Sequence, residues 1–390
     1  MSIPVFDRDN CWIDGLVELA NAHQGDHYRE GLFVSPHDHE QELVNDALSE
    51  DEREPLIIDF TGFGTPQSFT PPTARPLSDA IIAVDSGVVD LGELALGGTA
   101  FALRGAAVCY PPNNAQPFIC RYHTGALVID AQNQLELFHY MGHRLGRGNL
   151  FVNLLPTPPY YTPKSAMTES PNQIRDRCRN FVERMIQEEA IALLESYGGG
   201  ILLIDGALPA GTFDTPETYM RNLLSGCRNR GINVAAISKK TRITVGGRTI
   251  SNLFFEQPAF IGYAPLTQIL QQERQAASAN NQSLRPVEAI SVAEEIYAVR
   301  FSYAPPGLTF RIDIHPALGY LAPEVLDQVY SRCQIYGGYP RPLIEAHQYS
   351  SFLSQDMQSL LVDVIVRLGV RPQEEPSMDV LFQPFGGGFK

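Results

Sequence analysis

The chain has 390 residues and a formal net charge of -15 at neutral pH, with an isoelectric point near 5.0. This length exceeds that of a usual single domain, and this charge is opposite to that of a typical free DNA-binding domain. No apolar run approaches the roughly 20 residues that span a bilayer, and the amino terminus lacks a signal sequence. We therefore expect a soluble cytoplasmic protein with no membrane partner.

The six cysteines are scattered along the chain without a CxxC pair. This pattern argues against a zinc finger or a disulfide framework and favours reduced thiols in a cytoplasm. The sequence also lacks a GxxxxGK[ST] loop, so any ATP-driven translocation must come from another protein.

Residues 1–77 are predicted to form an amino-terminal extension. It contains an acidic run at residues 37–54, which accounts for much of the net charge, and scattered apolar residues: Trp12, Leu16, Leu19 and Phe33. Docking of a partner protein would explain these apolar residues, and the alternative is a solvated leader.

The first predicted core strand, residues 80–84, is a short apolar run that ends at Asp85. A second run, residues 201–204, ends at Asp205. A carboxylate at the end of a buried strand is costly unless a positive charge meets it. An aspartate followed by Ser-Gly or Gly-Ala is also a common turn, so neither residue is decisive alone.

The elements around these strands suggest how the aspartates meet. Strands are predicted at residues 99–110, 126–129 and 135–140, the last two joined by a turn at 130–134. A helix at residues 172–197 precedes the Asp205 strand, and a helix at 216–230 and a strand at 232–237 follow it. This order is that of the ribonuclease-H-like fold, an α/β fold whose mixed sheet is flanked by helices.

In that fold the first and fourth strands are adjacent, so Asp85 and Asp205 would lie side by side and could bind divalent metal. The topology supports two-metal phosphodiester chemistry but also has inactive relatives, so the fold alone does not decide the function.

The helix before Asp205 offers a third acid. Its apolar stripe is interrupted by Glu188 and Glu189, whereas Glu183 and Glu195 are expected to be solvated. An acid at such an edge usually pairs with Arg or Lys. Aimed instead at the two aspartates, it would complete an oxygen-ligand cluster suited to magnesium or manganese.

Basic residues after the strand at 232–237 are candidates for contact with phosphate. Lys239 and Lys240 would lie at the same sheet edge as Asp205, either as a phosphate clamp or as an ordinary solvated loop. Arg311 lies in an alternating strand with Phe310 and Ile312, where it pairs with a core carboxylate or holds the nucleic-acid backbone.

Five segments resemble, in order, the NurA family of DNA-end-processing nucleases. They are AVDSG (83–87), LLIDGAL (202–208) after the glutamate-bearing helix, AISKKT (236–241), FRIDIHP (310–316) and YGGYPRPLIEAH (336–347). The resemblance runs from about residue 78 to 360 and implies a nuclease domain at residues 78–390, with an insertion around 241–299.

The resemblance also implies a set of site residues. The metal ligands would be Asp85, Glu188, Asp205 and His347, and Tyr339 would complete the catalytic set. The family spacing favours Glu188 over Glu189. Taken alone, His347 and Tyr339 would be interpreted as ordinary packing or hydrogen-bonding residues. The chain has Asp85-Ser86-Gly87 where the family more often has Asp-Gly-Ser, and Asp205-Gly206-Ala207-Leu208 where it has DGSL.

The leading hypothesis is a deoxyribonuclease that uses two Mn²⁺ or Mg²⁺ ions. The resemblance implies 5′-to-3′ exonuclease and single-strand endonuclease activity at double-strand DNA ends. It also implies a homodimer that docks on a HerA-type hexameric ATPase. The alternatives are a catalytically inactive DNA-clamping or assembly subunit and another ribonuclease-H-like nuclease.

Overall fold

The computed structural model describes residues 3–8, 10–21, 32–34, 69–74, 79–94, 98–130, 133–145, 171–208, 217–239, 241, 244–245, 248–250, 261–267, 291–302, 308–368 and 371–372. Its elements, in chain order, are β1 (Val5–Asp7), α1 (Cys11–Asn21), β2 (Leu32–Val34), β3 (Ile81–Leu94), β4 (Thr99–Tyr110), η3 (Pro112–Asn114), β5 (Phe118–Ile129), α3 (Gln134–Arg144), α4 (Pro171–Ser196), β6 (Gly200–Asp205), α5 (Glu217–Asn229), β7 (Ile232–Ser238), β8 (Thr244–Val245), β9 (Arg248–Thr249), β10 (Gly262–Pro265), β11 (Glu295–Arg300), β12 (Phe310–His315), α8 (Ala322–Arg332), β13 (Ile335–Tyr336), β14 (Tyr339–Pro340), α9 (Arg341–Ser350), α10 (Ser354–Leu368) and β15 (Arg371–Pro372).

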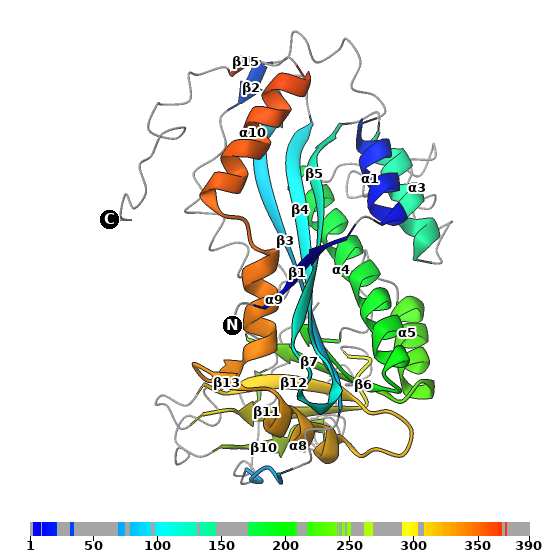
Figure 1. Ribbon diagram of the computed structural model, residues 1–390, viewed down its shortest axis with the longest axis vertical. Helices are drawn as coiled ribbons and strands as arrows, with labels where there is room; N and C mark the ends of the chain where they lie inside the picture. Colours follow the sequence, from blue (N-terminus) through cyan, green and yellow to red (C-terminus); the bar gives the residue numbers. More distant parts are fainter. Residues whose placement is uncertain are drawn as a thin grey trace, which may run out of the picture.

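A mixed sheet of eleven described strands runs through the molecule (Figure 1). Nine of them follow the order β1-β5-β4-β3-β6-β7-β12-β11-β10, and β2 joins the sheet by pairing with β3 and β15. Strands β3, β4 and β5 form an antiparallel meander, whereas β6 pairs with β3 and β7 in parallel. Strand β12 returns antiparallel beside β7. The prediction that the Asp85 and Asp205 strands are neighbours is therefore confirmed.

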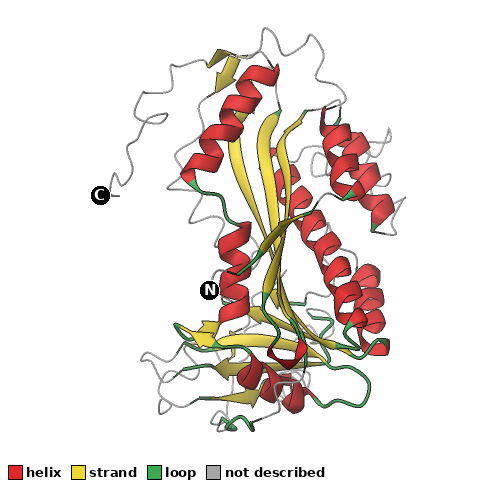
Figure 2. Ribbon diagram, viewed as in Figure 1, coloured by secondary structure: helices red, strands yellow, loops and turns green. Residues whose placement is uncertain are grey.

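Helices cover both faces of this sheet (Figure 2). On β3, Ile82 and Val84 pack with α1, α3, α4 and α5, whereas Ile81 and Ala83 face α8 and α9. This alternation follows from the two-residue repeat of a strand, and it explains why a strand buried on both faces reads as a continuous apolar run. The side chain of Asp85 falls on the same face as Ile81 and Ala83.

The long helix before Asp205 is present as predicted, and α4 packs one side of the sheet with a fully buried row that includes Ile186 and Leu194. The helix at 217–229 and the strand at 232–238 also match their predicted positions.

The predicted strand at residues 135–140 is wrong, because this segment belongs to helix α3. Its buried residues Leu137, Phe138, Met141 and Leu145 recur at helical spacing rather than in alternation. The preceding turn joins a strand to a helix: the Asn133 side chain accepts from the backbone N–H of Asp130 and donates to the carbonyl oxygen of Ala20.

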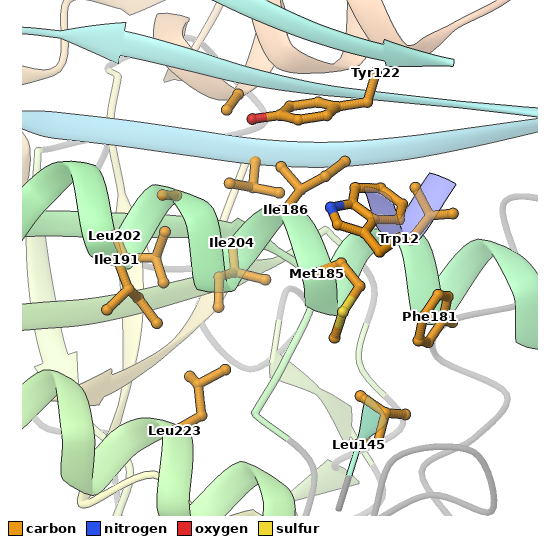
Figure 3. Packing of buried hydrophobic residues seen from close by; sticks show 14 of the residues in the cluster. Trp12, Tyr122, Leu145, Phe181, Met185, Ile186, Ile191, Leu202, Ile204 and Leu223 are labelled. Carbon is orange, nitrogen blue, oxygen red and sulfur yellow. The ribbon is translucent and has the colours of Figure 1, made fainter. Parts of the chain in front are cut away.

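Helix α1 is part of the core. Trp12 and Leu16 are 4% and 0% exposed, and Leu19 packs against the same cluster. Figure 3 shows Trp12 and Tyr122 beside the part of α4 that carries Met185 and Ile186. Trp12 and Leu16 were among the apolar residues that suggested partner docking, and packing in the core explains both of them. Phe33 lies in β2, of which the structure describes the backbone.

Several sequence expectations fall outside the described residues, namely those for the acidic run at 37–54 and for Lys240. Within the predicted insertion, β10 and β11 extend the sheet beside β12. The six cysteines are free, and five of them are buried. Within the described ranges, the helices are too short or too polar to cross a membrane.

Gly87 allows helix α9 to approach β3, and its replacement tests that contact. A Cβ atom at Gly87 would lie 2.5 Å from the backbone oxygen of Ser350, at the end of α9. We expect Gly87→Ala to lower the free energy of unfolding by about 1–3 kcal/mol, because one of the two backbones must shift.

Gly226→Ala is the matched control, because a Cβ atom at this position in α5 meets nothing within 4 Å. It should stabilise the helix by about 0.5–1 kcal/mol. Denaturant unfolding measures both effects, and an unchanged stability of Gly87→Ala would contradict the close approach.

Candidate active site

Asp85 and Asp205 lie side by side on two neighbouring parallel strands. Asp205 ends β6, whereas β3 continues past Asp85 to Leu94, so the predicted end of the first strand at Asp85 is wrong. The parallel register of β3 and β6 pairs Val84 with Ile204, so the next residues along the chain are the two aspartates. Neighbouring strands lie about 4.8 Å apart, and both carboxylates point to the face that α9 covers. Each side chain is 12% exposed. Two largely buried negative charges therefore share one sheet edge.

The Asp85 carboxylate is held by three groups. Its Oδ1 accepts the backbone N–H of Ser86 at 2.8 Å, and its Oδ2 accepts the hydroxyl of Ser350 at 3.1 Å. The same Oδ2 lies 2.9 Å from Nδ1 of His347. This hydrogen bond raises the pKa of His347 above its ordinary value, although partial burial opposes the shift. Because a carboxylate only accepts, Nδ1 carries the proton and Nε2 is left as the acceptor of the neutral ring.

The Asp205 carboxylate has a different set of partners. Lys239, which follows β7, places its Nζ 2.5 Å from Oδ2, and the Tyr339 hydroxyl donates to Oδ1 at 3.1 Å. Burial raises the pKa of Asp205, and the nearby charge of Asp85 raises it further, whereas Lys239 lowers it. The site therefore disfavours a second negative charge unless a cation stands beside it.

A cavity of about 300 Å³ opens at this edge. Its lining residues are Lys239, Phe310, Tyr339, Ile344 and His347. Lys239 and His347 have side chains that are 48% and 63% exposed, so both can meet a solute that enters the cavity. Five of the predicted site residues thus converge: Asp85, Asp205, Lys239, Tyr339 and His347.

Glu188 and Glu189 are not brought to this edge. Glu188 is exposed and accepts the hydroxyl of Tyr219 on α5 at 2.8 Å. Glu189 accepts hydrogen bonds from Asn10, Trp12 and Tyr122, at 2.5, 2.7 and 2.9 Å. Helix α4 covers the face of the sheet opposite to α9, so in this arrangement both carboxylates serve contacts among α1, β5, α4 and α5.

Glu183 of α4 is linked to Asp85 through Ser86. The expectation that it is solvated is wrong, because Glu183 is 2% exposed. Its Oε2 accepts the hydroxyl of Ser86, whose backbone N–H binds Asp85. A sequence signal was available: Glu183 shares one helical row, at spacings of four, three and four residues, with Gln187, Ala190 and Leu194, which are all buried.

Arg311 does not face the cavity. It is 1% exposed, and its guanidinium donates to both oxygens of Asp313 at 2.7 and 2.8 Å. Asp313 also accepts the backbone N–H of Leu208 and the hydroxyl of Ser291. Arg311 therefore forms the core ion pair that was the alternative prediction, and its assignment to phosphate binding is wrong.

The donor set at the sheet edge suits a hard divalent cation, because two carboxylates repel each other there and oxygen ligands are preferred by magnesium and manganese. Among the described residues, no three His, Cys, Asp or Glu side chains are gathered so as to hold a metal ion. The Lys239 ammonium forms an ion pair with Asp205.

Comparison with known proteins identifies a family. The model of the NurA domain family matches residues 79–352, which include the candidate site. No match was found among curated proteins.

Similar solved structures include the NurA nuclease from Sulfolobus solfataricus, with 11% identity, a TM-score of 0.38, and coverage of 85% of this chain and 95% of that chain. A structure of NurA with manganese has 14% identity, a TM-score of 0.33, and coverage of 84% and 99%. A structure of NurA bound to dAMP and manganese has 12% identity, a TM-score of 0.31, and coverage of 80% and 89%. We draw no functional argument from similarities of this size.

Asp85→Asn tests the ion pair with His347 in metal-free protein. We expect the pKa of His347 to fall from above 6.5 toward or below that value, because the neutral amide no longer favours the charged ring. NMR titration of the imidazole protons in EDTA measures the change. An unchanged pKa would contradict the contact.

The same contact predicts a pH dependence of stability. A raised folded pKa means that the His347 contribution is fully present below pH 6.5 and is lost as the pH rises through the folded value. The melting temperature of the wild type should therefore fall as the pH rises from 6.5 through the folded pKa of His347, relative to that of Asp85→Asn, which lacks the contribution. Thermal melts across this pH range measure the difference.

Proposed function

This chain belongs to the NurA domain family, a family of nucleases, and we propose that it is a divalent-metal-dependent deoxyribonuclease that processes DNA double-strand-break ends. The observation that carries the proposal is the pair of carboxylates, Asp85 and Asp205, on adjacent parallel strands inside the matched segment. Their shared charge is the feature that phosphodiester hydrolysis with metal ions requires.

We further propose a ribonuclease-H-like core, made of β5-β4-β3-β6-β7 with α4 and α5. Support comes from the antiparallel meander that passes through α4 into the parallel strands β6 and β7. This arrangement places the first aspartate on the central strand and the second on its parallel neighbour.

Asp85 and Asp205 would hold the metal, Mn²⁺ or Mg²⁺ and two ions by the family resemblance, with His347 nearby. When bound, such ions supply Lewis-acid charge and an activated water for the hydrolysis. Tyr339 orients Asp205 through its hydroxyl, and Ser350 orients Asp85. The role of these residues is to fix the two carboxylates before a ligand arrives.

Lys239 and His347 act on the substrate side of the cavity. The Lys239 ammonium bonds the Asp205 carboxylate, lies near the Tyr339 ring and lines the cavity, so it would also be a counter-charge for a phosphate oxygen of the substrate. Nε2 of His347 is free to accept a proton from water or to donate one when the ring is charged. Lys240 remains a further phosphate-binding candidate.

The helical acid has two candidates. The family spacing favours Glu188, whereas the contacts through Ser86 favour Glu183. We propose Glu183, because its buried carboxylate accepts the hydroxyl of Ser86, the residue after Asp85, whereas Glu188 points to α5. Arg184, 3.3 Å away, is the counter-charge of Glu183.

The net charge of -15 opposes capture of a polyanion, which supports dependence on a partner. We propose that a HerA-type hexameric ATPase feeds DNA ends to a cytoplasmic homodimer of this chain, which degrades them as a 5′-to-3′ exonuclease and single-strand endonuclease. Duplex degradation should then need ATP and both proteins. Equal degradation by the nuclease alone would contradict the partnership.

Loss of either carboxylate of the site tests the nuclease. We expect Asp85→Ala and Asp205→Ala each to abolish cleavage of end-labelled DNA in Mn²⁺ or Mg²⁺, and EDTA to abolish cleavage by the wild type. Glu195→Gln is the matched control, because this acid is 53% exposed and pairs with Arg230 away from the edge. Near-wild-type cleavage by a folded Asp85→Ala or Asp205→Ala variant would refute the proposed site.

Three single substitutions identify the helical acid. Glu183→Gln should reduce cleavage strongly, and Glu188→Gln should leave it close to the wild-type rate. Glu189→Gln should lower the melting temperature, because it weakens charge-assisted hydrogen bonds to Asn10, Trp12 and Tyr122. Digestion rates and melts of the three variants decide the matter. An inactive Glu188→Gln with an unchanged melt would restore Glu188 as the ligand.

A further inference from the structure

An exposed tyrosine stands beside the candidate active site on a tight hairpin. Strands β13 and β14 pair Tyr336 with Tyr339 across a two-residue turn. The turn residues, Gly337 and Gly338, have φ angles of 58° and 86°, which is the left-handed region that such hairpin turns require. The hairpin lies beside β12 and leads directly into α9 (Figure 1).

Residues that face each other in an antiparallel pair carry their side chains on the same face. Tyr339 is buried against Phe310, with ring centroids 5.2 Å apart, and its hydroxyl reaches Asp205. Tyr336 is 72% exposed. The pairing therefore sets one tyrosine at the carboxylates and a second, open ring next to it at the rim.

The hairpin that carries Tyr336 is braced. A Cβ atom at Gly338 would lie 2.9 Å from the Ser302 hydroxyl, and the Arg341 backbone N–H donates to the carbonyl oxygen of Gln334 at 2.9 Å. Arg341 also bonds the Gln334 side chain. An aromatic ring on a braced turn loses little conformational freedom when a flat ligand stacks on it.

The size of the cavity limits what enters it. A volume of about 300 Å³ is at the lower end for a ligand site, and Lys239 and His347 supply polar atoms suited to a phosphate and its water. The cavity has room for the sugar-phosphate of one nucleotide. The base must then lie at the rim, where Tyr336 offers an aromatic face.

We infer that Tyr336 is a stacking platform for one nucleobase of a single DNA strand whose backbone lies at Lys239 and the two aspartates. This inference rests on the proposed deoxyribonuclease activity and assigns the residue that positions the strand. Stacking on an aromatic ring tolerates any base, so the platform gives grip without sequence preference. Stacking also does not depend on surface charge. It can therefore contribute to DNA binding in a chain whose net charge of -15 repels a polyanion.

The test compares Tyr336→Ala, Tyr336→Phe and the wild type on a short fluorescent oligothymidylate. Anisotropy in Ca²⁺, a hard divalent cation that takes oxygen ligands, measures binding, and digestion in Mn²⁺ measures cleavage. We expect Tyr336→Ala to weaken binding about 5- to 150-fold, the range for one stacked base, and Tyr336→Phe to stay within about twofold. Tyr320→Ala is the matched control: Tyr320 is 38% exposed and follows β12 at the opposite sheet edge.

An abasic position moved along the oligonucleotide provides the second readout. At one position it should weaken wild-type binding as much as Tyr336→Ala does, and the variant should show no additional loss there. Binding by Tyr336→Ala equal to the wild type, or no binding by the wild type, would overturn the inference. If the wild type binds and Tyr336→Ala loses affinity but neither cleaves DNA, the proposed nuclease fails and the platform stands.

Discussion

Two carboxylates side by side on neighbouring parallel strands impose the constraint on which the rest of the site depends. Asp85 and Asp205 are both largely buried, so each negative charge raises the cost of the other. Every described contact around them offsets that cost. His347 and Ser350 serve Asp85, and Lys239 and Tyr339 serve Asp205. The surroundings of the pair can therefore be understood as counter-charge and hydrogen-bond donors placed before any ligand arrives.

The donors come from parts of the chain that are far apart in sequence. Ser350 and His347 lie on α9 and reach β3 because Gly87 lets the two backbones come close. Lys239 follows β7, which lies beside β6 in the sheet. The site is thus assembled by the sheet order and by one close helix-to-strand contact, and its integrity depends on the packing of the whole domain.

The acids of α4 show how neighbouring residues of one helix serve different purposes. Glu189 connects α4 with α1 and β5, and Glu188 accepts a hydrogen bond from Tyr219 of α5. Glu183 is buried and accepts a hydrogen bond from Ser86, the residue that follows Asp85 on β3. Helical periodicity places Glu183 in the buried row and Glu188 and Glu189 at its border. It cannot tell which partner each one meets, because the partners belong to other elements.

The sequence alone predicted the long helix, the two buried strands that carry Asp85 and Asp205, and their adjacency, because apolar periodicity and chain order are local or topological properties. It did not predict that β3 continues past Asp85 to Leu94. His347 and Tyr339 came from family motifs, and the structure brings both to the aspartates. The tertiary structure decided what local pattern could not. It made residues 135–140 a helix, placed Trp12 and Leu16 in the core, paired Arg311 with Asp313 and buried Glu183. In each case the side chain's environment is set by residues distant in sequence, and a pattern read along the chain contains no information about them.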